Sequence, residues 1–62
     1  KNFAELMAAD LIDDAVNLND ERQVASCLLR HRYGGPVIAE LMDVAIATAK
    51  SVVDAAAQRA AE

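Results

Sequence analysis

Apolar residues recur along this chain at the three- and four-residue spacing of amphipathic helices. The pattern is interrupted around residues 17–19 and again at residues 34–36, where Gly, Gly and Pro follow one another. No stretch shows the strict alternation of apolar and polar residues that is typical of a strand. The chain is therefore predicted to be all-α and to form one domain, with helices over about residues 2–17, 20–33 and 36–61.

The first two predicted helices each have one apolar face. Asp10, Asp13 and Asp14 lie opposite the first of these faces, with Leu6 among them as an exposed apolar exception. The apolar face of the first helix contains Phe3, Ala4, Met7, Ala8, Leu11, Ala15 and Leu18. The second helix is expected to bury Val24, Cys27 and Leu28, with His31 on the same face.

The ends of the second helix also carry recognisable signals. Asp20 and Gln23 fit a capping box, in which each side chain accepts a hydrogen bond from the other residue's backbone N–H. Gly34 suits the left-handed position that often follows the last turn of a helix. Pro36 then suits the first position of the third helix, because proline has no N–H to leave unpaired there.

The third predicted helix, over residues 36–61, has an unusually wide apolar surface. Its apolar side chains span roughly 200° of a helical wheel, whereas a helix that packs on one surface needs only about 100° or a little more. The two shorter helices are expected to cover one side of this arc and to leave the other side bare. The side predicted to be bare contains Ile38, Met42, Ala45, Ile46, Ala49 and Val53.

A second copy of the chain is the partner that the sequence favours for this bare side. A domain of 62 residues is marginally stable by itself, and the single cysteine excludes an internal disulfide. We therefore predict a helical-bundle homodimer related by a two-fold axis, with Ala45 and Ala49 where the two long helices approach closely. A different protein as the partner is the other form of association left open, and two alternatives to a homodimer remain as well. In one, the chain is a monomer whose short helices wrap both sides of the third helix. In the other, the chain is a fragment of a longer protein, and the missing part of that protein covers the bare side.

The charge balance narrows the choice of other partners. Ten acidic residues outnumber six Lys and Arg, which gives a net charge of −4 and disfavours both nucleic acids and anionic membranes as partners. A helix-turn-helix DNA-binding regulator is the main functional alternative, because three helices and a glycine-containing turn are compatible with it. However, the third helix has no Lys or Arg before Lys50, although the early residues of a recognition helix contact bases and phosphates. The lone cysteine favours a reducing compartment, so a cytoplasmic location is expected.

Two groups of residues suggest chemistry. Cys27 and His31 are spaced i, i+4, so they fit half of a Cys₂His₂ zinc site completed by a second copy, or a thiol–imidazole nucleophile. The sequence favours a structural role instead, with a buried cysteine beside a histidine whose ring reaches solvent or a carboxylate. The acidic residues lack the spacing of a calcium loop and are interpreted as a solvated face, in which Asp14 is expected to pair with an arginine of the second helix.

The cationic residues at the end of the second helix, Arg30, His31 and Arg32, are expected to complement the helix dipole. We therefore expect no catalytic residue, no cofactor and no metal. The predicted function is a small module for protein–protein interaction and dimerisation in a regulatory or accessory role, and not an enzyme.

Overall fold

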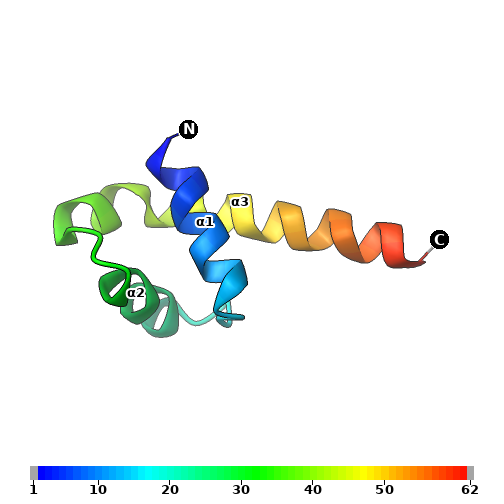
Figure 1. The fold of residues 1–62 in the computed structure, drawn as a ribbon, viewed down its shortest axis with the longest axis horizontal. Coiled ribbons are helices and arrows are strands. Elements are labelled where there is room, and N and C mark those ends of the chain that lie inside the picture. The colour runs from blue at the N-terminus through cyan, green and yellow to red at the C-terminus, as the bar shows by residue number, and fades with distance from the viewer. Residues whose placement is uncertain (1, 62) are drawn as a thin grey trace.

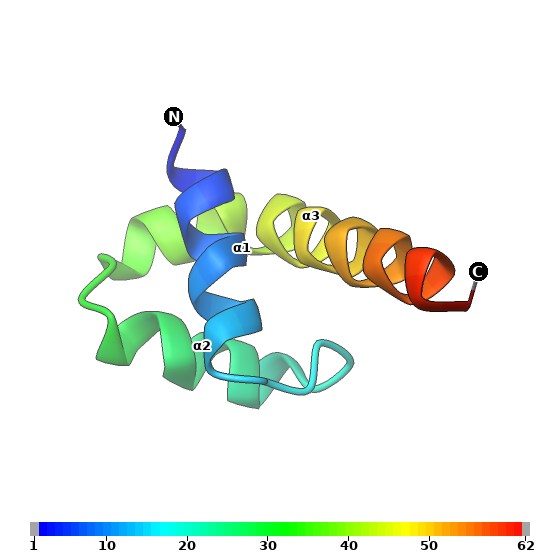
Figure 2. The same cartoon turned by 45° about the vertical axis from the view of Figure 1, so that its right-hand side comes forward.

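Three helices make up the computed structural model, which describes residues 2–61 (Figure 1). They are α1 (Phe3–Asp13), α2 (Glu21–Arg30) and α3 (Gly35–Ala61). The all-α prediction is thus confirmed for the described residues, which include no strand. Helix α1 crosses the middle of α3, α2 lies beside the first turns of α3, and the second half of α3 extends away from both (Figures 1 and 2). None of the described helices is both long and apolar enough to cross a membrane.

Helix α1 ends four residues before its predicted end. It begins after Asn2, whose Oδ1 accepts a hydrogen bond of 2.9 Å from the Glu5 N–H. At its other end, Ala15 adopts a left-handed conformation with φ 53°. The Val16 N–H then donates to the Leu11 carbonyl at 3.2 Å, which is the pattern of a Schellman motif. This turn was not predicted from the sequence, because alanine rather than glycine occupies the left-handed position.

Half of the predicted capping box forms at the start of α2. Asp20 Oδ1 accepts hydrogen bonds from the N–H groups of Arg22 at 3.0 Å and Gln23 at 3.3 Å. The Gln23 side chain does not return the bond as predicted, because its Oε1 accepts from the Asn17 N–H at 3.4 Å. The Asp20 N–H donates instead to the Asn17 carbonyl at 3.0 Å. This arrangement ties the α1–α2 loop to the first turn of α2.

The turn that ends α2 uses Arg32 and not Gly34. Arg32 has φ 68°, whereas neither glycine of the chain has a positive φ. The Arg32 N–H donates to Leu29 at 3.0 Å and the Tyr33 N–H donates to Leu28 at 3.2 Å, which completes a second Schellman motif. Helix α2 therefore ends three residues before the predicted position.

Helix α3 begins one residue earlier than predicted. It starts at Gly35, so Pro36 occupies the second helical position. The Ile38 N–H donates to the Gly34 carbonyl at 3.0 Å and closes the first helical turn. Proline is tolerated here because its missing N–H would have no partner inside the first turn.

The core lies where the three helices meet, and it uses the side of α3 that was predicted to be bare. Ala45 and Ala49 are fully buried and Ile38 is 7% exposed, all within one chain. Val44 and Val52, on the side predicted to be covered, are instead 51% and 50% exposed. The buried core cluster consists of Met7, Leu11, Val24, Cys27, Leu28, Ile38 and Ala45.

Close approach through alanine explains this choice of side. Ala4 and Ala8 of α1 are buried, as are Ala45 and Ala49 of α3. Small side chains on both helices let the two backbones come close where α1 crosses α3. The buried alanines of α1 and α3 fit the predicted packing through small side chains, but within one chain rather than between two.

The two short helices leave the end of α3 uncovered. At 27 residues, α3 is about 40 Å long, whereas the 11 residues of α1 span only about 16 Å. Residues 51–60 are all exposed, including Val52 and Val53. The prediction that the two short helices leave part of the apolar surface of α3 bare is therefore confirmed, although most of the bare part is not on the predicted side.

Candidate functional site

A polar cluster joins the C-terminal end of α1 to the C-terminal end of α2. Asp14 follows the last residue of α1, Cys27 lies in the last turns of α2, and His31 is the residue after α2. The Cys27 thiol donates to Asp14 Oδ2 at 3.1 Å, and His31 Nε2 lies 2.9 Å from the same oxygen. Arg30 Nη2 lies 4.0 Å from that oxygen as well. A single carboxylate oxygen is therefore the common partner of a thiol, an imidazole and a guanidinium.

A second carboxylate, one helical turn earlier, extends the cluster. Tyr33 Oη donates to Asp10 Oδ2 at 2.6 Å. Asp10 Oδ1 lies 3.9 Å from His31 Nδ1, so the two ring nitrogens of His31 face two different carboxylates. Asp10 and Asp14 are spaced i, i+4, which places both on the side of α1 that faces the end of α2.

The protonation states of the cluster follow from this geometry. The pKa of the Cys27 thiol is raised to about 11, first by burial and second by its hydrogen bond to the Asp14 carboxylate. The pKa of Asp14 is lowered, chiefly by the hydrogen bond from Cys27 and next by the one from His31. Burial, and then the hydrogen bond to Asp10, raise the pKa of Tyr33 to about 12. In this arrangement Cys27 is a neutral thiol that donates to an ionised carboxylate.

This arrangement differs from an activated thiol–imidazole pair. Such a pair needs the imidazole to accept the thiol proton, which generates the thiolate. Here the thiol donates to Asp14, and His31 Nε2 faces the same carboxylate rather than the sulfur. The geometry therefore favours a structural or ligand-binding role for Cys27 over nucleophilic chemistry.

An apolar hollow lies on another surface, between the start of α1 and the first half of α3. Its volume is about 520 Å³. Phe3 and Leu6 line it from α1 and are 58% and 42% exposed, and the half-exposed Val44 lines it from α3. The complete lining is Asn2, Phe3, Ala4, Leu6, Leu41 and Val44, and none of these residues is charged.

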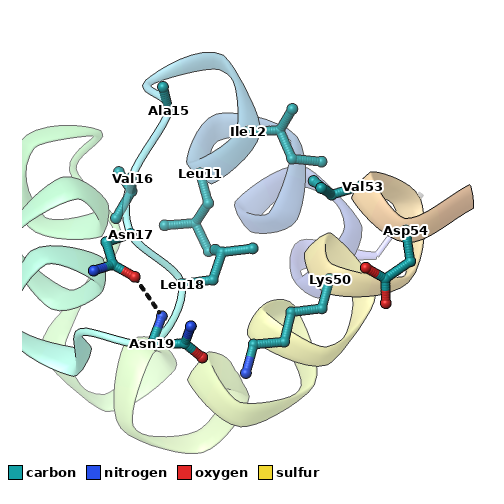
Figure 3. Close-up of a pocket in the computed structure, with 10 residues that line it drawn as sticks. All are labelled: Leu11, Ile12, Ala15, Val16, Asn17, Leu18, Asn19, Lys50, Val53 and Asp54. Carbon is teal, nitrogen blue, oxygen red and sulfur yellow. Dashed lines mark hydrogen bonds between the residues drawn. The ribbon is translucent and has the colours of Figure 1, made fainter. Parts of the chain in front are cut away.

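A further hollow, of about 550 Å³, lies between the α1–α2 loop and the second half of α3 (Figure 3). Leu11 and Leu18 point into it, and Lys50 and Asp54 border it from α3. On the loop, the Asn19 N–H donates to Asn17 Oδ1 at 3.0 Å. Its lining includes no histidine, cysteine or serine, so it offers none of the usual nucleophiles or general bases apart from Asp54 and Lys50.

Comparisons of the chain with protein-family models, with curated proteins and with solved structures give no match. Function is therefore inferred from the residues of this chain. Two features carry most of the information: the polar cluster around Asp14, and the exposed apolar side chains of α1 and α3.

The structure confirms several sequence predictions about the polar cluster. Cys27 is fully buried, the ring of His31 reaches a carboxylate, and Asp14 is near an arginine of α2. Sequence reasoning missed Asp10 and Tyr33. The i, i+4 spacing of Asp10 and Asp14 indicated that the two carboxylates lie on the same side of the first helix. The helix was predicted to continue to residue 17, so the position of Asp14 directly after its last residue was not predicted.

The residues predicted to form a dimer interface differ in how far they are exposed. Ile38, Ala45 and Ala49 are buried in the chain, so they present no open surface in this structure. Met42 and Ile46 are half-buried against the core. Val53 is 46% exposed and borders the hollow of Figure 3. The apolar side chains of α3 that are free to contact another chain are therefore its exposed valines, Val44, Val52 and Val53.

Proposed function

We propose that this chain is a self-associating helical module and that its partner is a second copy of itself. The observation that carries this proposal is the uncovered half of α3, in which residues 51–60 are all exposed. Figure 2 shows this half extending away from α1 and α2. An uncovered helix with apolar side chains gains stability when another surface removes them from water.

One uncharged stripe on α3 suits such a contact. The stripe consists of Leu41, Val44, Thr48, Val52 and Ala55. These residues are spaced by three or four, so they lie along one side of the helix. The side chains of Val44 and Val52 are about half exposed, and the apolar hollow beside Phe3 and Leu6 adjoins the first part of the stripe.

The stripe is complementary to itself when two copies run antiparallel. A two-fold axis near Thr48 places Val44 of each copy opposite Val52 of the other, and Leu41 opposite Ala55. The uncovered end of each α3 would then lie along the apolar hollow of the other copy, beside Phe3 and Leu6. Self-complementarity of this kind favours a second copy over an unrelated partner, because one surface provides both halves of the contact.

The test compares two glutamate substitutions on α3. Val52→Glu places a charge in the stripe, whereas Ala47→Glu places the same charge at an exposed position on the polar side of the helix. Sedimentation velocity should show the wild type and Ala47→Glu as dimers and Val52→Glu as a monomer. Each variant should keep the wild-type helical circular dichroism, since both positions are exposed.

Two results would contradict the proposal. A wild-type chain that sediments as a monomer at roughly tens of micromolar has no self-association to explain. A Val52→Glu variant that remains as dimeric as Ala47→Glu would show that the contact, if present, does not use the stripe.

A further inference from the structure

The donor atoms of Asp14, Cys27 and His31 are spaced like the ligands of a small metal ion. Cys27 Sγ, a ring nitrogen of His31 and a carboxylate oxygen of Asp14 all lie within 4.8 Å of one another. The distances to Asp14 Oδ2 are 3.1 Å from the sulfur and 2.9 Å from the nitrogen. A tetrahedral zinc site with ordinary bond lengths separates such atoms by about 3.3–3.6 Å. Binding therefore requires the two contacts to Asp14 to lengthen by about 0.4 Å. The sulfur and the ring nitrogen, which lie within 4.8 Å of each other, have to come to about 3.6 Å.

The chemistry of the donors selects the class of ion. A thiolate, an imidazole and a carboxylate together suit Zn²⁺ and Co²⁺, whereas Mg²⁺ and Ca²⁺ prefer oxygen ligands alone. The three donors leave a fourth tetrahedral position for water or another ligand. Asp14 and His31 have side chains that are about one third exposed, so an ion can reach the site from solvent.

Asp10 provides an independent indication. When histidine binds a metal through one ring nitrogen, the other nitrogen usually contacts a carboxylate or a carbonyl group that orients the ring. His31 approaches this arrangement, because Nε2 faces Asp14 while Nδ1 lies 3.9 Å from Asp10 Oδ1, which is within ion-pair distance but longer than a hydrogen bond. Tyr33 donates to the other oxygen of Asp10 and so holds that carboxylate in place.

We infer that Asp14, Cys27 and His31 form a three-ligand binding site for one Zn²⁺ ion per chain, with Asp10 as a positioning residue. On binding, the Cys27 thiol loses its proton to solvent and the imidazole coordinates through neutral Nε2. The ion then replaces the hydrogen bonds that now join the three side chains. The site connects the end of α1 to the end of α2 and does not depend on the proposed self-association.

Two features of the cluster weaken its affinity for zinc. The thiol is protonated in the metal-free chain, so binding competes with protons. Arg30 places a positive charge 4.0 Å from Asp14 Oδ2, but its side chain is 68% exposed and can turn into solvent. Removal of this charge by Arg30→Gln should therefore strengthen zinc binding, and a weaker affinity in this variant would contradict the assignment.

The experiment titrates the reduced, metal-free chain with ZnCl₂ and, separately, with CoCl₂ and MgCl₂. Calorimetry should show one Zn²⁺ bound per chain and no binding of Mg²⁺. Co²⁺ should produce the sulfur-to-metal absorption of a cobalt thiolate together with the visible bands of tetrahedral coordination. The melting temperature of the chain should rise with Zn²⁺ and return to its starting value after a chelator is added.

Matched variants distinguish binding at this site from non-specific binding of metal elsewhere on the chain. Cys27→Ser keeps a group that donates to Asp14 but removes the thiolate, so the cobalt–sulfur band should vanish while the helical content stays. Asp10→Asn, which keeps an acceptor for Tyr33, should weaken zinc binding by about 10- to 100-fold, as expected for a residue that orients a ligand. Asp13→Asn, next to the site but outside the cluster, should bind like the wild type. The inference is wrong if the wild type binds no Zn²⁺, or if Cys27→Ser binds it with unchanged affinity.

Discussion

Replacement of Ala49 by glutamate is expected to destabilise the single chain rather than to separate two chains. Ala49 is fully buried within one chain. A buried carboxylate without a partner costs about 3–5 kcal/mol. The total stability of a 62-residue domain is roughly 3–9 kcal/mol, at about 0.05–0.15 kcal/mol per residue. The substitution should therefore remove between about a third and all of the free energy of unfolding.

Val52→Glu is the matched comparison, because it introduces the same charge three residues later on α3. Val52 is 50% exposed, so the charge stays in water and the stability of the isolated chain should change by no more than about 0.5 kcal/mol. Urea unfolding followed by circular dichroism measures both variants. Each measurement is made at two protein concentrations, because only an effect on association depends on concentration.

The outcome distinguishes the two sides of α3. We expect Ala49→Glu to be strongly destabilised to the same extent at both concentrations. If Ala49→Glu unfolds at the same urea concentration as Val52→Glu when both are dilute, Ala49 is not enclosed by its own chain, and the assignment of the core side of α3 would be wrong.

Three smaller predictions follow from the caps and the polar cluster. Asp20→Ala should destabilise the chain by about 1 kcal/mol, because the N–H groups of the first turn of α2 lose their acceptor; urea unfolding measures the change, and no change would refute the capping role. Arg32→Gly should raise stability by up to about 1 kcal/mol, because glycine adopts φ 68° without the strain that a side chain brings. The greater freedom of glycine in the unfolded chain offsets part of this gain. Thermal unfolding measures the change, and a clear loss of stability would contradict this reasoning. Tyr33→Phe should lower the free energy of unfolding by about 1–2 kcal/mol, because the hydrogen bond to Asp10 is lost. If that bond is the cause, the same substitution in an Asp10→Ala background should lower it by much less.

Local signals in the sequence determined where the helices begin and which faces of α1 and α2 are apolar. Asp20 caps α2 as predicted, because an N-cap needs only one side chain and the N–H groups two and three residues later. The buried face of α2 was also predicted, and that of α1 in part, because Phe3 and Ala15 of its predicted apolar face are exposed. The helix ends were less predictable, because Ala15 and Arg32 adopt left-handed conformations that their side chains do not favour.

The candidate zinc site was only half visible in the sequence. Cys27 lies on α2 and His31 directly follows this helix, so their i, i+4 spacing alone indicated that they could act together. Asp14 and Asp10 come from another helix, and they reach the pair only because the packing of α1 brings its last turn against the end of α2. No pattern within one helix contains that information.

The chain's composition and periodicity established by themselves that it is helical and that α3 carries more apolar surface than two short helices can cover. Tertiary structure alone decided which part of that surface is hidden. A helical wheel gives the width of an apolar arc, but the position and angle at which another helix crosses it determine which sector is buried. Here the sector that contains Ala45 and Ala49 is buried within the chain, whereas Val44 and Val52 stay about half exposed.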